Sequence, residues 1–418
     1  VNPTAIRAYL DDTKTALGGK APALYEKLSR LETLLPGVRQ AFSDKVSSNT
    51  VDEVIGQAQE ILALKREIIL ANPLLDMDKI IVARYRLGNK ARKAMGPSMG
   101  TSTANYNSLF SNSRKGYDAE IDLLTGLRGQ IESSRIYKPE ADVPVSDIQL
   151  HWDADRLLFC DANYLPDGKV VATTNIGYNG VPCVHGDDVV ANLVSFDPET
   201  RALRRLTFDQ DGNWSPIVIP NGRIMYTRWE YTDLTHYFSR IVMHMNPDGT
   251  ENKALYGSGS YFPNSTFDMK PLSKHSSRFI GIISGHHGTA RSGRLVIFDP
   301  AKSRKEEKGM IQELPFKDRP IVPIIKDELV EGVWPQFMKP YPLSEKYFLV
   351  ACKPAKDALW GIYLVDVFDN LTLIASCHPF EDQAGQQRGY GLYPGYLRRR
   401  RYAGRSPGHD QGTPYLRL

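Results

Sequence analysis

The stretch SGHHGTARSG, residues 284–293, concentrates the side chains best suited to chemistry. His286 and His287 offer imidazoles for metal binding or proton transfer, and Arg291 offers a guanidinium for an anion. Adjacent strand residues face opposite sides, so both imidazoles reach one ion only where the glycines bend the backbone. No further histidine follows at i+2 or i+4, and the chain has no H-E-x-x-H. A structural turn is therefore favoured, with a ligand or metal site and catalysis as alternatives.

A second candidate is TRWEYTDLTHYFSR, residues 227–240, which joins two expected strands. Its charged residues stand among aromatic ones: Arg228, Glu230, Asp233, His236 and Arg240. A charged and aromatic loop at a strand end is a plausible ligand surface. The alternative is an intramolecular network in which arginines pair with the acids. His236, His244 and His185 lie on other repeats and could add ligands to a metal held by His286 and His287.

Motifs for covalent haem attachment, for a four-cysteine zinc site and for phosphate binding are missing from the sequence. The four cysteines form no C-x-x-C pair, which excludes a C-x-x-C-H haem site and a four-cysteine zinc site. The chain has no phosphate-binding loop, because no glycine-rich stretch ends in Gly-Lys-Ser/Thr. We therefore expect no cofactor.

Composition places the chain among ordinary folded proteins. It has 418 residues, 41% hydrophobic and 24% charged, and no apolar run near the roughly 20 residues of a membrane span. The net charge is +4, and the segment from Cys377 onward, with seven arginines and three acids (7 − 3 = 4), accounts for all of it. The remainder is balanced and shows no basic face, so nucleic acid is not an expected partner.

Residue patterning divides the chain into three parts. Residues 1–75 predict a helical N-terminal segment, with one helix after Pro22 that stops at Pro36 and another after the capping box that begins at Thr50. Residues 76–376 read as short strands separated by turn signals such as Pro-Asp-Gly, apart from a polar stretch at 92–113 expected to be a surface loop. Residues 377–418 form an irregular Arg/Gly-rich tail, which we interpret as a truncated or out-of-frame end.

The strands repeat in a way typical of a β-propeller. One hairpin recurs in YLPDGKVVAT, VIPNGRIMYT, PLSKHSSRFIGII and YPLSEKYFLVA, and each is followed by an element such as LVSFDPETRALRRLT. Such repeats of four short strands predict a mainly β fold, a propeller of about five to seven blades. At residues 152–169, WDADRLLFCDANYLPDGK, two hairpins follow each other with almost no sequence between them. About one blade's worth of strands is therefore expected to be missing, and the propeller to be incomplete.

Several of these segments resemble one known family. NPLLDMDKIIVAR, LTFDQDGNWSPIVIPNGRIMYTRWEYTD, SGHHGTARSGRLVIFDP and WGIYLVDVFDN resemble bacterial proteins related to the middle domain of the hydrazine synthase alpha subunit, with Tol-type, WD-like propeller repeats. The resemblance covers residues 72–374 and implies a propeller in a periplasmic or exported protein. The haems of that family are attached outside this domain, in agreement with the missing C-x-x-C-H.

These observations lead to one predicted function and one alternative. The prediction is a non-catalytic propeller, a binding or scaffold module that presents loops to a protein partner or small ligand. The alternative is an enzyme or enzyme subunit with a metal- or redox-dependent site at the propeller channel, using the His286 and His287 loop. Fold alone does not decide between them, because propellers host both.

Overall fold

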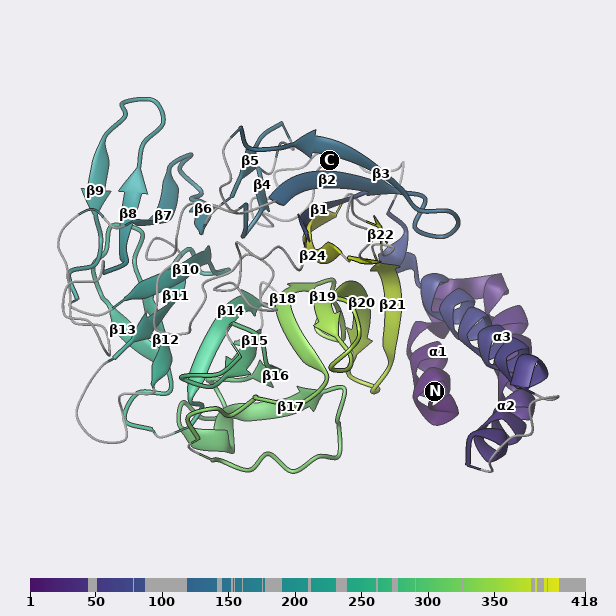
Figure 1. Ribbon diagram of the computed structural model, residues 1–418. Helices are drawn as coiled ribbons and strands as arrows, with labels where there is room; N and C mark the ends of the chain where they lie inside the picture. The colour runs from purple at the N-terminus through teal and green to yellow at the C-terminus, as the bar shows by residue number, and fades with distance from the viewer. Residues whose placement is uncertain are drawn as a thin grey trace.

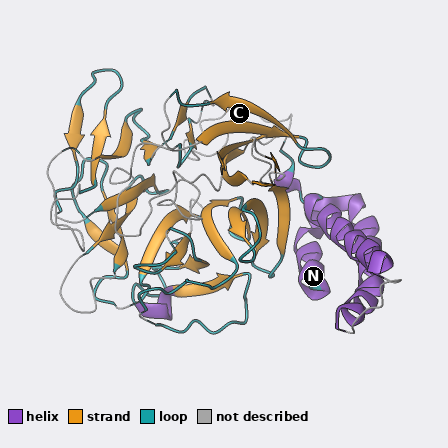
Figure 2. Ribbon diagram, in the orientation of Figure 1, coloured by secondary structure: helices purple, strands orange, loops and turns teal. Residues whose placement is uncertain are grey.

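The computed structural model describes the chain except for residues 44–50, 78, 87–118, 141–144, 152, 154, 160, 175, 177–189, 210–211, 231–238, 261, 273–276, 290, 325, 377–379, 382–386, 389 and 398–418. The expected surface loop at 92–113 therefore lies outside the described residues. Helices occupy the N-terminal part, and strands follow from Lys79 onward (Figure 1). The helices gather on one side of the strands (Figure 2).

Three amphipathic helices make up the N-terminal part: α1 (Pro3–Leu17), α2 (Ala21–Ser43) and α3 (Val51–Leu70), with short 3-10 turns η1 (Gly18–Lys20) and η3 (Pro73–Leu75). The side chain of Asn2 caps α1 by accepting a hydrogen bond from the Thr4 amide at 3.1 Å. α2 continues through Pro36 instead of ending there, because its buried face extends from Leu35 to Val38 on the other helices. The apolar stripe thus outweighs the hydrogen bond lost at the proline.

The helices are fastened to the outer edge of the last large sheet. The Lys65 ammonium donates to the Leu371 carbonyl at 2.7 Å, and Arg66 donates to the carbonyls of Leu373 and Ile374. Tyr9 of α1 packs edge-on against Tyr347, with ring centroids 5.3 Å apart. These contacts supply the partner surface that amphipathic helices require.

We divide the described strands into six blades, numbered 1 to 6 around a ring; blades 4 and 5 are joined into one eight-stranded sheet. Blade 1 contains β24 (Tyr390–Leu397), β1 (Lys79–Arg86), β2 (Ala119–Thr125) and β3 (Glu132–Tyr137). Blade 2 contains β4 (Gln149–Leu150) and β5 (Leu157–Leu158). Blade 3 contains β6 (Ala162–Tyr164), β7 (Val170–Thr174), β8 (Asn192–Phe196) and β9 (Leu203–Arg205).

Blades 4 to 6 have the same four-stranded plan. Blade 4 contains β10 (Asn213–Val218), β11 (Ile224–Trp229), β12 (Arg240–Met245) and β13 (Lys253–Tyr256). Blade 5 contains β14 (Ser265–Pro271), β15 (Phe279–Ser284), β16 (Arg294–Phe298) and β17 (Met310–Leu314), with the 3-10 turn η7 (Glu306–Gly309) before β17. Blade 6 contains β18 (Gln336–Pro342), β19 (Tyr347–Lys353), β20 (Gly361–Asp366) and β21 (Leu371–Ser376).

The inner strands close a ring. In turn, β24 lies beside β4, β4 beside β6, β6 beside β10, β10 beside β14, β14 beside β18, and β18 beside β24 (Figure 1). The ring of blades is a β-propeller, as the hairpin repeat predicts. Blade 2 has two described strands where the others have four, which confirms the incomplete propeller expected from the close hairpins at residues 152–169.

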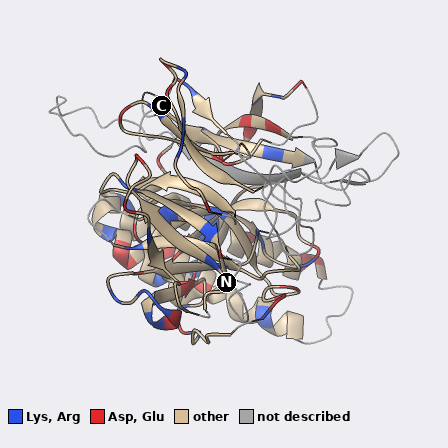
Figure 3. Ribbon diagram, turned by 90° about the vertical axis from the view of Figure 1, so that its left-hand side faces the viewer, with Lys and Arg blue, Asp and Glu red and all other residues tan. Residues whose placement is uncertain are grey.

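The strand β24, near the C-terminus, closes the ring. β24 pairs antiparallel with β1, from Ile80 opposite Leu397 to Arg86 opposite Tyr390. Residues 390–397 therefore form a strand, not the irregular structure expected for residues 377–418; a short pair, β22 (Phe380–Glu381) and β23 (Gln387–Arg388), precedes it. Basic and acidic residues are interspersed along the ribbon of the described elements in Figure 3.

Candidate functional site at the centre of the ring

The inner edge of the ring carries a repeated backbone feature. Five residues at matching places adopt a left-handed conformation, with φ between 51° and 63°: Asp147, Asp161, Ser215, Asp268 and Lys339. Non-glycine residues rarely do so, and such strain often accompanies a functional or structural constraint. In β10, β14 and β18 the ladder shifts register around this residue. Ser215, Asp268 and Lys339 therefore form β-bulges, each of which re-aims one side chain.

The sequence carries a signal for these residues that the hairpin comparison did not use. Asp161 stands five positions before Pro166, and Ser215 stands five before Pro220 (166 − 161 = 220 − 215 = 5). Asp268 and Lys339 stand at the same offset from the serines of the two Pro-Leu-Ser turns. Aligning the repeats on their turns would have picked out one polar residue per inner strand.

Lys339 joins three blades through the centre. Its ammonium lies 2.5 Å from Asp147 Oδ1 and 2.7 Å from Asp268 Oδ1. Blade 1 separates blades 2 and 6 along the ring, so the contact between Lys339 and Asp147 runs through the channel. Burial alone would lower the pKa of Lys339, but Asp147 and Asp268 raise it above the ordinary value. Lys339 therefore stays charged and acts as a tie between blades.

Asp161 ties blade 3 to blade 4. Its carboxylate accepts hydrogen bonds from the Thr173 hydroxyl and, at 3.0 Å, from the Ser215 amide. Burial, followed by the nearby negative charge of Asp147, raises the pKa of Asp161. The channel thus holds acids in different states: Asp147 and Asp268 are ion-paired with Lys339, and Asp161 is pushed towards its neutral form.

Arg291 brings the SGHHGTARSG segment into the channel. Its guanidinium lies 4.5 Å from the Phe267 ring centroid and 4.9 Å from that of Trp214, a cation–π geometry on both rings. The side chain is buried and burial lowers its pKa, an effect opposed by Asp161 and Asp268. Trp214 and Phe267 directly precede two of the bulged residues, so Arg291 rests on the inner edges of blades 4 and 5.

His286 and His287 lie together but face different surroundings. Their rings pack edge-to-face, with ring centroids 4.3 Å apart. His286 is fully buried, and its Nδ1 lies 2.5 Å from a guanidinium nitrogen of Arg240. Burial, then the positive charge of Arg240, lowers the pKa of His286 to about 2. The ring is therefore neutral, with Nδ1 accepting from Arg240 and the proton on Nε2.

His287 instead pairs with an acid at the surface. Its Nδ1 lies 2.8 Å from both carboxylate oxygens of Asp327, and its side chain is 38% exposed. Gly285 permits the close approach, since a Cβ there would collide with the Asp327 carbonyl, which accepts from the His286 amide at 2.8 Å. Among the described residues no group of three or more His, Cys, Asp or Glu is placed to hold a metal, and the metal site at His286 and His287 stays a prediction.

The second candidate loop contains paired charges. Arg228 contacts Glu230 and lies 3.1 Å from Asp209. Arg240 is fully buried with its guanidinium 4.5 Å from the Trp229 ring centroid. The described contacts thus match an intramolecular network. Asp233 and His236, also predicted as ligand-binding, lie outside the described residues, as does His185.

The two adjacent histidines should differ sharply in their effect on stability. His286→Ala removes the acceptor that faces the buried Arg240 guanidinium and should lower the free energy of unfolding by about 1–3 kcal/mol. His287→Ala removes a partly exposed contact with Asp327 and should cost under about 1 kcal/mol. Urea unfolding of the two variants at one pH measures both. Equal losses would contradict the assignment of His286 as the buried structural partner of Arg240.

Comparison with known proteins bears on the fold. No family model matches the sequence, and no curated protein matches it. Similar solved structures include Kuenenia stuttgartiensis hydrazine synthase, with 12% identity, a TM-score of 0.48, and coverage of 76% of this chain and 47% of that chain. TolB from Acinetobacter baumannii has 12% identity, a TM-score of 0.41, and coverage of 81% and 69%.

Hydrazine synthase and TolB, the proteins that the sequence resemblance names, are thus both among the similar solved structures. The tricorn protease is also similar, with 9% identity, a TM-score of 0.37, and coverage of 67% of this chain and 29% of that chain. The chain spans 47% of the length of the hydrazine synthase chain it matches. At such identities the likeness does not extend to activity. Among the described helices, none is long and apolar enough to cross a membrane.

Proposed function

We propose that this chain is a non-catalytic binding or scaffold propeller that holds a protein partner at one end of its ring. The surface concerned, the loop face, consists of residues 285–289 after β15 and residues 326–333 before β18. The export expected from the family resemblance belongs to the same proposal.

One observation carries the proposal: the two segments of the loop face are fixed to each other. The His286 amide donates to the Asp327 carbonyl at 2.8 Å, and His287 pairs with the Asp327 carboxylate. The Thr289 hydroxyl donates to Glu331 at 2.8 Å. A surface already held in one arrangement loses little conformational entropy when a partner binds.

The charged groups at the channel support a structural role for the centre. Lys339, Asp147 and Asp268 satisfy one another, and Asp161 is held by Thr173 and Ser215. Groups committed to ties between blades keep the ring rigid, which favours recognition by the loops that the ring positions.

A photo-crosslinking residue at Glu328 tests this function in cells that make the protein. We expect one discrete crosslinked partner from position 328, which is exposed on the loop face, and none from Asp248, which is exposed on a turn at the opposite end of blade 4. The purified partner should then bind the wild type more tightly than His287→Ala.

Two results would overturn the proposal. The same crosslinks from positions 328 and 248 would show that the loop face is not selective. Turnover of a substrate by the purified chain, abolished in a folded Arg291→Met variant, would show a catalytic channel instead.

A further inference from the structure

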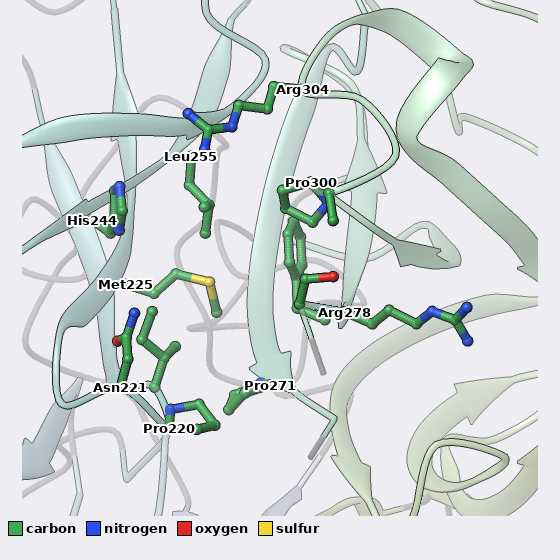
Figure 4. A pocket seen from close by; sticks show the side chains of 13 residues that line it. Pro220, Asn221, Met225, His244, Leu255, Pro271, Arg278, Pro300 and Arg304 are labelled. Atoms are coloured by element: carbon green, nitrogen blue, oxygen red, sulfur yellow. The ribbon is translucent and has the colours of Figure 1, made fainter. Parts of the chain in front are cut away.

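A pocket of about 380 Å³ lies between blades 4 and 5. Its walls come from the turn before β11, from the start of β15 and from the turn after β16, including Pro220, Phe279 and Pro300 (Figure 4). β11 and β15 run from this pocket to the loops around Trp229 and His286, so the pocket lies at the opposite end of the ring from the loop face. Its size suits a small organic molecule.

The walls are apolar and fixed in position. Met225, Leu255 and Phe279 line the interior, and three prolines, Pro220, Pro271 and Pro300, complete it. Proline has a locked φ and no amide hydrogen, so these wall positions are rigid and offer no backbone donor. An apolar body placed here would displace water from a surface that already has its shape.

The polar side chains that line the pocket present donors. His244 Nδ1 accepts from Arg223 Nε at 3.0 Å, which leaves the ring proton on Nε2. Burial, then the charges of Arg223 and Arg304, lowers the pKa of His244 to about 4, so the ring is neutral near pH 7. Asn221 Oδ1 accepts from the Arg223 amide at 3.1 Å, which leaves its NH₂ group available.

Arg304 supplies a positive charge to the pocket. It lines the pocket, and Figure 4 shows its guanidinium on the His244 side, whereas Arg278 extends away from the pocket. Among the described residues, no carboxylate lies within ion-pair distance of Arg304, whereas the Arg278 guanidinium lies 3.3 Å from Asp299. Asp299 also accepts from Ser277 and the Ala301 amide. Asp299, the acid beside Arg278, is therefore engaged, and no acidic residue lines the pocket.

We propose that this pocket binds a small organic acid, with its anionic group at Arg304 and His244 Nε2 and its apolar body against Met225, Leu255 and Phe279. The donors would meet the anion through charge-assisted hydrogen bonds, which are stronger than neutral ones. This site is separate from the loop face, and either can exist without the other.

Two fluorescent probes of nearly the same shape test the site. 8-Anilinonaphthalene-1-sulfonate is an apolar anion, and N-phenyl-1-naphthylamine lacks its charge. We expect the anion to bind the wild type and Arg304→Gln to weaken it about tenfold, because one charge-assisted contact is lost. Binding of the neutral probe should change little in Arg304→Gln. Ala301→Trp, at the rim of the pocket, should weaken both probes.

Arg156→Gln is the matched control, since it removes an exposed arginine in the remote β4–β5 hairpin. All variants are first compared with the wild type by circular dichroism melting. No binding of the anion to the wild type would overturn the proposal. Equal affinities in Arg304→Gln and Arg156→Gln would also overturn it, as would full binding of both probes by Ala301→Trp.

Discussion

Lys339→Met should lower the free energy of unfolding by about 3–5 kcal/mol, the usual cost of removing one partner from a buried ion pair. Methionine approximates the length of lysine but leaves Asp147 and Asp268 without their shared cation. The side chains of these two acids are 19% and 5% exposed, so water only partly replaces the lost partner. Urea unfolding followed by tryptophan fluorescence measures the loss.

The rescue variant separates charge from packing. Asp147→Asn with Asp268→Asn in the Lys339→Met background removes the uncompensated charges and should recover most of the lost stability, because a buried ion network can often be replaced by neutral groups. Lys169→Met, which removes an exposed lysine paired with Asp167, should leave the unfolding midpoint unchanged. Comparable losses in Lys339→Met and Lys169→Met would show that Lys339 does not tie the blades.

The propeller could be predicted because the signals for each hairpin lie within a few neighbouring residues of the sequence. Each hairpin carries its own turn signal and its own alternation, and the repeat places equivalent hairpins in equivalent blades. The same repeat also predicted the incomplete blade. Leu157 and Tyr164 belong to successive hairpins, and the sequence between them is too short for the remaining strands of a whole blade. The path of α2 through Pro36 was not predictable from that signal, since it depends on contacts with the other helices.

The site was less accessible because its partners are distant in sequence. His286 and His287 were conspicuous, but their roles depend on Arg240 and Asp327, each about 40 or more residues away. The bulged residues change the face on which a side chain emerges, so simple alternation does not identify the residues at the channel. Arg291 was predicted as a ligand-binding residue, and its position on Trp214 and Phe267 followed only from the fold.

The central ties explain how a ring with a reduced blade can stay closed. Blade 2 has two described strands and therefore little sheet surface to pack against its neighbours. Asp147, two residues before β4, is held by Lys339 from across the channel. An ion pair in a partly dry channel is directional and holds the short hairpin in place where broad apolar packing is reduced. The ion pairs at the centre of the ring thus compensate for the reduced packing of blade 2.

A chain truncated after residue 386 should lose its native fold or precipitate. The truncation removes β24, which pairs with β1 from Ile80 to Arg86 and is the strand through which blade 1 meets blade 6. β1 would become an exposed edge with a row of unpaired amides and carbonyls, and such edges promote aggregation. Ile81, Ala83 and Tyr85 are buried in the intact chain, so the new edge would also be apolar.

A chain truncated after Leu397 is the matched control, because it keeps all of β24. It should stay soluble and should protect the amides of residues 80–86 from hydrogen exchange as the full chain does. A soluble 1–386 variant with the same protection at residues 80–86 would show that β24 does not close the ring. Protection lost there and kept in blades 3 to 5 would instead locate the damage at the junction of blades 1 and 6, as expected when one strand joins the two ends of the ring.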